Sequence, residues 1–239
     1  MVTPYKNEDI SKKEQVESMF DNIAHRYDFL NHLLSAGMDI RWRKKAIQKL
    51  EKYHPEILMD MATGTGDFAF EALSLKPKKI VAYDLSANMI KYGIEKSKQL
   101  KVEDVVEFVK GDSELMPFAA GSFDAMTVGF GVRNFENLEK GLSEMWRVLR
   151  DHGQLVILEI AKPKGVIKPF FKFYFHYFSP MIGKLFSKDA RAYEYLPESV
   201  EAFPEGMDFV KILEKVGFKN VKYEKLTFGI CAMYTCSKT

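Results

Sequence analysis

The sequence predicts an α/β fold: a seven-stranded, mostly parallel sheet that ends in an antiparallel hairpin and carries an N-terminal helical cap. From residue 56 onward, apolar strand-like runs alternate with helical patterns, which is typical of a parallel sheet covered on both faces. The first of these strands runs into a glycine turn at Gly64 and Gly66. No proline- or glycine-rich linker divides the 239 residues, so we expect one domain.

Composition and charge place the chain among soluble globular proteins. Apolar residues make up 46% of it and charged residues 28%. A formal net charge of +2 gives no reason to expect nucleic acid as a partner. The polar N-terminus and the lack of any window of about 18 apolar residues predict neither a signal peptide nor a membrane span, so we expect a cytoplasmic protein.

The N-terminal region, residues 1–53, reads as a helical cap. Ser11 and Glu14 form a capping-box pattern, and an apolar stripe at helical spacing follows from Val16. Further helices are expected over 29–34 and 42–53. Two roles suit this cap, and they are compatible: packing on the sheet edge and covering a ligand site.

Residues 54–162 read as a cofactor-binding core. Each predicted strand is a short apolar run, and Ser86 is a suitable N-cap for the helix after the second strand. The predicted strands are 57–62, 79–84, 105–110, 123–130 and 154–160, and the predicted helices are 67–75, 86–99 and 136–149.

Residues 163–206 interrupt this alternation with an aromatic run at 170–178, flanked by lysines. Such a run is either a buried helix or a functional segment, which would be an apolar lid for a greasy substrate or a surface that touches lipid. Aromatic residues on every side favour the functional segment.

The last segment, 207–239, predicts a helix over 208–216 that is closed by Gly217, then strands 221–226 and 230–236. Cys231 and Cys236 are oddly spaced, so on one strand they face opposite sides and are expected to stay reduced.

The glycine turn by itself suits two kinds of cofactor. Gly64-x-Gly66-x-x-Ala69 fits the dinucleotide fingerprint, but a pyrophosphate needs backbone N–H groups and little negative charge. Asp60 and Asp67 flank the turn and make it a poor phosphate site. A ligand with a positive sulfur and an ammonium group fits better, which describes S-adenosylmethionine.

Two further acids stand where the next strands end. Asp84 is placed to accept hydrogen bonds from both ribose hydroxyls of a nucleoside, and Asp112 with Ser113 is placed to bind the adenine amino group. Because ligands of such folds bind outside the carboxyl ends of the strands, we expect Asp84 and Asp112 to converge there. The alternative role of each aspartate is a helix cap or a turn.

Five motifs, spread from about residue 15 to the end of the chain, combine into one pattern. The Arg-Tyr-Asp opening and the Phe-Gly-Val-Arg-Asn segment are specific, whereas the Gly-Asp and Phe-Asp pieces are shared by many methyltransferases. The motifs are Val16–Asp28 with Asn31 and Trp42-Arg43, Gly111–Phe118 followed by Ser122–Asp124, Phe130–Phe135, Ala192–Val200 and Leu226–Ile230.

This pattern resembles the quinone C-methyltransferase family, whose members methylate demethylmenaquinol or the equivalent ubiquinone precursor. The resemblance implies a Rossmann-like class I methyltransferase domain that uses S-adenosylmethionine, with Gly64, Thr65 and Gly66 at the cofactor. It also implies a prenylated quinol substrate, met beside the membrane. The sequence departs from the family at Gly129, where relatives often have Ser, and at Asp151-His152-Gly153, where Pro-Gly-Gly is common.

C-methylation requires an electron-rich ring, and two motif residues suit that requirement. The Arg133 guanidinium can hold a phenolate, and Tyr27 is a candidate proton relay. His25 is a second candidate proton relay, but it lies beside the helical stripe, which favours a structural role. No His/Cys cluster has metal-ligand spacing, so we predict no metal.

Several alternatives remain open on the sequence. The methyl acceptor can be the ubiquinone-precursor quinol or another phenolic molecule instead of demethylmenaquinol. A nicotinamide dehydrogenase and a cofactor-binding protein without catalysis are rivals from other classes. The residues do not define the oligomeric state, a homodimer included.

Overall fold

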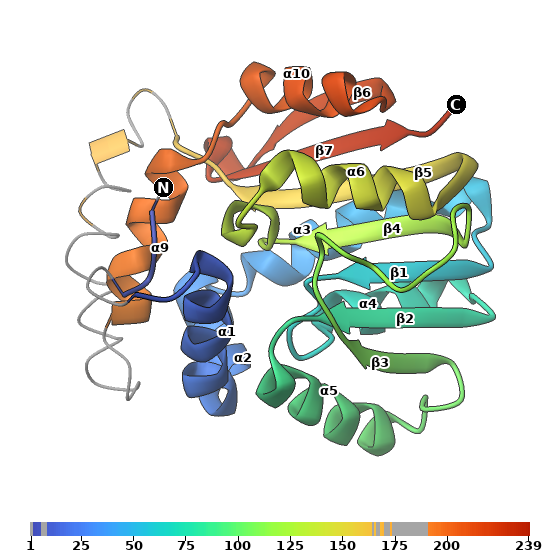
Figure 1. Cartoon of the computed structure of the whole chain (residues 1–239), viewed down its shortest axis with the longest axis horizontal. Helices are drawn as coiled ribbons and strands as arrows, with labels where there is room; N and C mark the ends of the chain where they lie inside the picture. The colour runs from blue at the N-terminus through green and yellow to red at the C-terminus, as the bar shows by residue number, and fades with distance from the viewer. Residues whose placement is uncertain (1, 6–8, 164, 166–167, 170–172, 174–190) are drawn as a thin grey trace.

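The computed structural model describes residues 2–5, 9–163, 165, 168–169, 173 and 191–239 (Figure 1). The predicted aromatic run 170–178 lies outside this part of the chain except for Phe173, whose side chain is exposed. Across the described ranges, no helix combines the length and the apolar character that a membrane crossing requires.

The strands form one sheet of seven, in the order β3-β2-β1-β4-β5-β7-β6. Neighbours from β3 through β5 pair in parallel, whereas β7 runs antiparallel to both β5 and β6. The predicted mostly parallel sheet with a C-terminal hairpin is therefore confirmed. The strands are β1 (Ile57–Met61), β2 (Lys79–Asp84), β3 (Val106–Lys110), β4 (Phe123–Gly129), β5 (Leu149–Ile160), β6 (Lys219–Leu226) and β7 (Cys231–Ser237).

Helices cover both faces of this sheet (Figure 1). Successive strand residues point to opposite faces, so Leu58 belongs to one apolar cluster and Met59 to the other. The Leu58 cluster includes α3 (Met38–Gln48) and α4 (Asp67–Ala72), with α5 (Ala87–Leu100) beside β2 and β3. The Met59 cluster includes α6 (Leu138–Val148) and α10 (Met207–Val216).

Within the predicted cap, residues 1–53, α3 is preceded by α1 (Lys12–Ile23), the short helix η1 (Ala24–Arg26) and α2 (Tyr27–Ser35). The capping box is confirmed, because the Glu14 backbone N–H donates to Ser11 Oγ and the Ser11 N–H donates to the Glu14 carboxylate. The cap packs on α5 and on α9 (Arg191–Ala202) through a third apolar cluster. Asp21 extends this contact by accepting hydrogen bonds from Ser86 Oγ and the Asn88 N–H, at 2.5 and 2.9 Å, at the start of α5.

Two elements begin four or five residues earlier than the sequence pattern predicts. α3 starts at Met38 instead of residue 42, because Gly37 takes a positive φ of 71° that lets α3 begin directly after α2. β5 starts at Leu149 instead of residue 154, because the Asp151–Gly153 segment is an irregularity inside the strand, where the register with β4 shifts. Residues 151–153, where the family commonly has Pro-Gly-Gly, therefore lie inside strand β5.

Candidate active site

An open pocket lies beside the carboxyl ends of β1 to β4 and is bordered by α1; its empty space, including the solvent at its mouth, is about 730 Å³. This is the edge where ligands bind in open α/β sheets. Four of the predicted cofactor residues line it (Gly64, Asp84, Asp112 and Ser113), as does the predicted catalytic Tyr27. The other lining residues are Lys13, Val16, Glu17, Phe20, Met61, Ala62, Leu85, Ser86, Met89, Gly111, Glu114, Gly129, Phe130, Gly131, Asn134, Phe135 and Glu136.

Asp84 is fixed at the end of β2 by backbone donors. Its carboxylate accepts from the Gly64 N–H at 2.7 Å and from the Ser86 N–H at 2.8 Å. Burial raises the pKa of Asp84, and the hydrogen bonds from Ser86 and Gly64 oppose that effect. Each carboxylate oxygen can accept a second hydrogen bond, so Asp84 keeps acceptor capacity toward the pocket.

Asp112 meets a residue that sequence reasoning missed. Its Oδ2 lies 2.7 Å from Lys13 Nζ, and its Oδ1 accepts from the Glu114 N–H at 2.9 Å. Lys13 stands in the first turn of α1, so the cap contributes charge to the pocket as well as covering it. The apolar stripe that begins at Val16 was the only sequence signal for this placement.

The pocket carries an excess of negative charge. Five carboxylates line it against a single lysine among the described lining residues. Such a lining opposes a phosphate or pyrophosphate and suits a ligand that carries a sulfonium and an ammonium group. The acidic lining therefore fits S-adenosylmethionine, with the Asp84 carboxylate as the hydrogen-bond acceptor for hydroxyl groups. The acids are Glu17, Asp84, Asp112, Glu114 and Glu136.

The two acids that first suggested this ligand act elsewhere, which corrects the sequence argument. Asp60 is 1% exposed and does not line the pocket. It accepts from Thr63 Oγ1 at 2.6 Å and from Thr127 Oγ1 at 2.7 Å. Burial raises its pKa to about 7, although these hydrogen bonds oppose the shift. Asp60 therefore stabilises the glycine turn through its hydrogen bond with Thr63, the residue before Gly64.

Asp67 faces away from the pocket, toward α3 and α5. Its carboxylate lies 2.6 Å from Lys96 Nζ and 3.3 Å from Arg43 Nη2. Thr65, predicted to bind cofactor, belongs to the same network through its hydrogen bond to Asp28, and its side chain is buried outside the pocket.

Gly66 does not line the pocket either, and its role is conformational. Its φ is +92°, and a Cβ there would lie 2.7 Å from the Phe108 ring and 2.9 Å from the Phe70 ring. Only a residue without a side chain fits this turn before α4.

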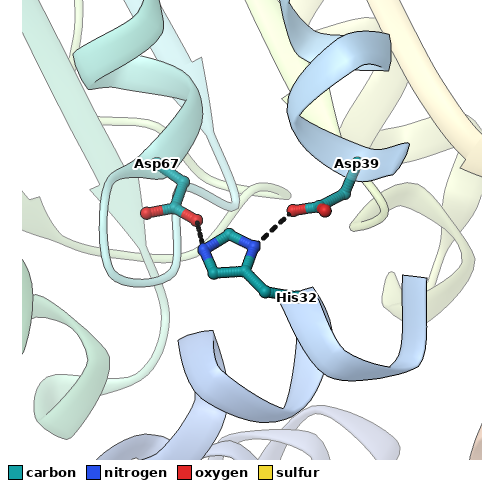
Figure 2. A group of neighbouring side chains, drawn as sticks. All are labelled: His32, Asp39 and Asp67. Carbon is teal, nitrogen blue, oxygen red and sulfur yellow. Dashed lines mark hydrogen bonds and ion pairs between the residues drawn. The ribbon is translucent and has the colours of Figure 1, made fainter. Parts of the chain in front are cut away.

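His32 stands between Asp39 and Asp67 (Figure 2). Its Nδ1 lies 2.8 Å from Asp39 Oδ2, and its Nε2 lies 3.6 Å from Asp67 Oδ2. Within the described residues this is the one histidine–carboxylate group compact enough to share an ion. Arg43 contacts both carboxylates and Lys96 contacts Asp67, so cationic side chains already balance these charges. We therefore interpret the group as an ion-pair network that joins the cap to the core.

Tyr27 lies at the junction of η1 and α2, and its ring borders the glycine turn. A Cβ on Gly64 would lie 3.6 Å from the ring. Burial raises the pKa of Tyr27, while a hydrogen bond with the Asn31 side chain and the charge of Arg133 act in the opposite direction. The phenol therefore stays protonated at neutral pH, which makes it a hydrogen-bond donor or relay instead of a standing base.

Arg133 lies behind the pocket wall and does not line the pocket. The short helix η4 (Val132–Asn134) carries it, and its Nη1 lies 2.8 Å from Glu159 Oε1. The Glu159 side chain is fully buried and that of Arg133 is 9% exposed. Arg133 Nε also donates to Ser199 Oγ of α9 at 3.3 Å. Lys12 secures the same segment by donating to the carbonyls of Arg133 and Phe135, at 3.1 and 2.8 Å.

Two buried polar atoms near Arg133 have no hydrogen-bond partner within the described part of the chain: Asn134 Oδ1 and Tyr195 Oη. Asn134 lines the pocket, and Tyr195 packs in the same apolar cluster as Tyr27. A buried acceptor without a partner is costly, so Asn134 Oδ1 marks a position where a ligand or water would be stabilised. Asn134 adjoins Arg133 in the Phe-Gly-Val-Arg-Asn motif, yet it was not predicted as a site residue.

Curated relatives match nearly the whole chain. A protein of Bacteroides fragilis named demethylmenaquinone methyltransferase is 48% identical, over 99% of this chain and 97% of its own length. A protein of the same name from Porphyromonas gingivalis is 42% identical, over 98% and 96%. A ubiquinone/menaquinone biosynthesis C-methyltransferase of Geotalea daltonii is 43% identical, over 95% and 97%.

Solved structures agree on the fold. A SAM-dependent methyltransferase from Thermotoga maritima superposes with a TM-score of 0.62 at 18% identity, over 93% of this chain and 99% of its own. Another from Aquifex aeolicus gives 0.58 at 18% identity, over 81% and 89%. The Rossmann-like methyltransferase fold predicted from the sequence is thereby confirmed. Residues 8–238 match the model of the ubiE/COQ5 methyltransferase family, and with relatives of 42–48% identity along nearly its whole length, the chain belongs to that family.

Proposed function

We propose that this protein uses S-adenosylmethionine to methylate a ring carbon of a reduced, prenylated quinone, converting demethylmenaquinol to menaquinol. The observation that carries the proposal is the acid-lined pocket at the carboxyl edge of the sheet, in a chain that is 48% identical over nearly its full length to a demethylmenaquinone methyltransferase.

The pocket residues would hold the cofactor by charge and shape. Asp84 would accept hydrogen bonds from hydroxyl groups, and Asp112 with Ser113 would face the base. Val16 and Phe20 of α1 supply apolar lining for a flat ring. When bound, S-adenosylmethionine supplies an electrophilic methyl group on a positive sulfur.

The remaining residues would prepare the acceptor ring. A quinol becomes a better carbon nucleophile as its hydroxyl proton is shared or lost. The Arg133 guanidinium, held by Glu159 behind the pocket wall, would stabilise the developing phenolate by its charge, which already acts against the burial that raises the pKa of the Tyr27 phenol in the pocket. The protonated Tyr27 would donate a hydrogen bond to a ring oxygen. Asn134 Oδ1 would accept a hydrogen bond from the quinol hydroxyl group or from a water molecule. Holding the two substrates together contributes further acceleration.

The decisive assay offers reduced demethylmenaquinone and S-adenosylmethionine and reads the product by mass. We expect one added methyl group with the quinol and none with the oxidised quinone, because the quinone is itself an electrophile. Equal turnover of both forms, or of neither, would contradict the proposal. Calorimetry with NADH in place of S-adenosylmethionine tests the dehydrogenase alternative, for which only NADH would bind.

The ubiquinone-precursor quinol is the second candidate acceptor. It is favoured by the 43% identity to a relative whose name covers both ubiquinone and menaquinone biosynthesis. Presenting both quinols in one reaction and comparing the two methylated masses would separate them.

We also propose that the protein works as a peripheral protein at the membrane surface, because prenylated quinols dissolve in lipid. The aromatic run at 170–178, of which the structure describes only Phe173, supports this proposal, and we propose a lid role for residues 163–206. A homodimer is a further proposal, which light scattering on the purified chain would test.

A further inference from the structure

The first turn of α1 contacts two walls of the pocket. On one side, Lys13 Nζ lies 2.7 Å from Asp112 Oδ2, beyond the end of β3. On the other side, the Lys13 N–H donates to the Glu136 carboxylate at 3.4 Å, and Lys12 Nζ donates to two carbonyls beside Asn134. Figure 1 shows α1 standing at the carboxyl ends of β1, β2 and β4, where the pocket lies. The start of the cap therefore connects the predicted adenine side of the pocket to the segment that carries Asn134.

Lys12 holds Asn134 through both of its neighbours in the chain. Its Nζ donates to the carbonyl of Arg133 at 3.1 Å and to the carbonyl of Phe135 at 2.8 Å. Within the described ranges, Lys12 is the one hydrogen-bond donor to either carbonyl. The peptide units on either side of Asn134 are therefore tied to a helix of the cap.

The short helix η4 gives this segment little support of its own. It is three residues long, and no side chain of the described residues caps its start. Its hydrogen bonds run from the Asn134 N–H to the Gly131 carbonyl at 3.0 Å and from the Phe135 N–H to the Val132 carbonyl at 3.3 Å. Hydrogen bonds of a 3₁₀ turn have poorer geometry than those of an α-helix. The two bonds from Lys12 therefore contribute a large part of what keeps this turn in place.

The Lys12 side chain is held in a confined place with its charge. Burial and the charge of Arg133 lower the pKa of Lys12 to about 8, while Glu136 and Glu114 act in the opposite direction. The ammonium form therefore still prevails at neutral pH, and a charged donor strengthens the bonds to the two carbonyls. Burying an ammonium group costs free energy unless it is hydrogen-bonded, so the side chain stays against these carbonyls instead of extending into solvent.

Asn134 is the residue of this segment that meets the ligand space. It lines the pocket, and its buried Oδ1 has no hydrogen-bond partner in the part of the chain that the structure describes. From these contacts we propose that Lys12 is a positioning residue for the methyl acceptor: it holds the η4 segment so that Asn134 Oδ1 is in place for the quinol hydroxyl group. The inference rests on the proposed function for the role of Asn134 toward the quinol, whereas the hold of Lys12 on the segment requires no substrate.

Hydrogen exchange followed by NMR on the full chain, without substrates, tests the hold directly. Lys12→Met removes the donor at similar side-chain length, and the backbone N–H groups of Asn134 and Phe135 should then exchange about tenfold faster or more. Lys12→Arg keeps a cation with several donors and should restore most of the protection. The matched control is Lys110→Met, which removes a different tie of α1, the 2.6 Å ion pair with Glu17. Unchanged exchange in Lys12→Met, or an equal increase in Lys110→Met, would overturn the proposal.

Methylation kinetics with the reduced quinol test whether the hold acts through Asn134. Lys12→Met should lower kcat/KM for the quinol about tenfold to hundredfold, because a small displacement of a group that aligns the acceptor is costly. Calorimetry should find the Kd for S-adenosylmethionine within about threefold of the wild-type value, and Lys12→Arg should recover most of kcat/KM. Lys110→Met should stay within about twofold of the wild type, since its ion pair is exposed.

A double variant separates positioning from a general structural role. Asn134→Ala should itself lower kcat/KM for the quinol, and adding Lys12→Met should then cause a further loss of about twofold at most, because both changes remove the same contact. Losses that multiply in the double variant, or an unchanged kcat/KM in Lys12→Met, would overturn the proposal.

The two kinds of measurement can fail independently. If the wild type methylates no quinol, the proposed function fails, while hydrogen exchange still decides whether Lys12 holds the Asn134 segment. If the wild type methylates the quinol and Lys12→Met exchanges like the wild type, the proposed function stands and the positioning role of Lys12 is wrong.

Discussion

The buried pair between Arg133 and Glu159 allows catalytic and structural roles to be separated. Glu159 is fully enclosed, and it accepts from Arg133 Nη1 at 2.8 Å, from the Arg133 N–H at 3.3 Å and from the Ile160 N–H at 2.9 Å. Removing either charged partner leaves the other buried and uncompensated, which costs about 3–5 kcal/mol. For a domain of this size that corresponds to a fall in Tm of about 6–20 °C.

We expect Arg133→Met and Glu159→Leu each to lower the Tm by that amount. The double variant should recover most of the loss, because an apolar pair of similar volume replaces the ion pair. Recovery stays incomplete, since the two backbone N–H groups that donate to Glu159 lose their acceptor.

Turnover should not recover with stability. If the guanidinium stabilises a phenolate, Arg133→Met and the double variant should both lose about 10²–10³-fold in kcat. The affinity for S-adenosylmethionine should stay near the wild-type value, because Arg133 does not line the pocket. Differential scanning fluorimetry, calorimetric titration and the mass-based assay supply the three readouts. A double variant that regains full turnover together with its Tm would make Arg133 a purely structural residue.

Three other predictions concern the aspartates. Asp84→Ala should weaken S-adenosylmethionine binding by about 1–3 kcal/mol, measured by calorimetry, and an unchanged affinity would remove Asp84 from the site. Asp67→Asn should lower the Tm and leave cofactor affinity within about twofold, since Asp67 pairs with Lys96 and Arg43 outside the pocket; a much weaker affinity would return it to the site. Folding raises the pKa of Asp60 from 3.8 to about 7, so the folded chain holds a proton that the unfolded chain has lost in this range. The unfolding free energy of the wild type should therefore decline relative to that of Asp60→Asn as pH rises from about 4 to 7. Urea denaturation at several pH values measures both free energies, and the same pH dependence for the two proteins would refute the prediction.

The core elements could be predicted from the sequence because local signals agree there. Apolar runs, the Ser86 cap and the Gly217 stop define β1, β2, α5 and α10 to within a residue or two. The start of β5 could not be predicted, because Asp151-His152-Gly153 has turn chemistry and only the pairing of β5 with β4 keeps it in the strand.

Site residues that stand at the end of a parallel strand could be predicted from the sequence. Residues whose place in the site depends on the direction of the side chain could not. Asp84 and Asp112 converge as expected, because parallel strands bring their carboxyl ends together. Asp60 and Asp67 flank the same turn in sequence, but one points into the core and the other toward α3 and α5. Lys13 enters the pocket from a helix 99 residues away in sequence from Asp112, a pairing that no local pattern indicates.

The ion-pair network around Asp67 determines which residues must be transferred together when the cap, residues 1–53, is exchanged between related proteins. Asp28 and His32 of α2, Arg43 of α3 and Lys96 of α5 all contact this carboxylate or its neighbour Thr65. Asp39 of α3 joins the network through His32 and Arg43. A chimera that imports residues 1–53 from another protein must therefore import matching partners at 65, 67 and 96. Without them, a transplanted cap would leave carboxylates and cations half-buried beneath it, and the graft would be less stable than either parent.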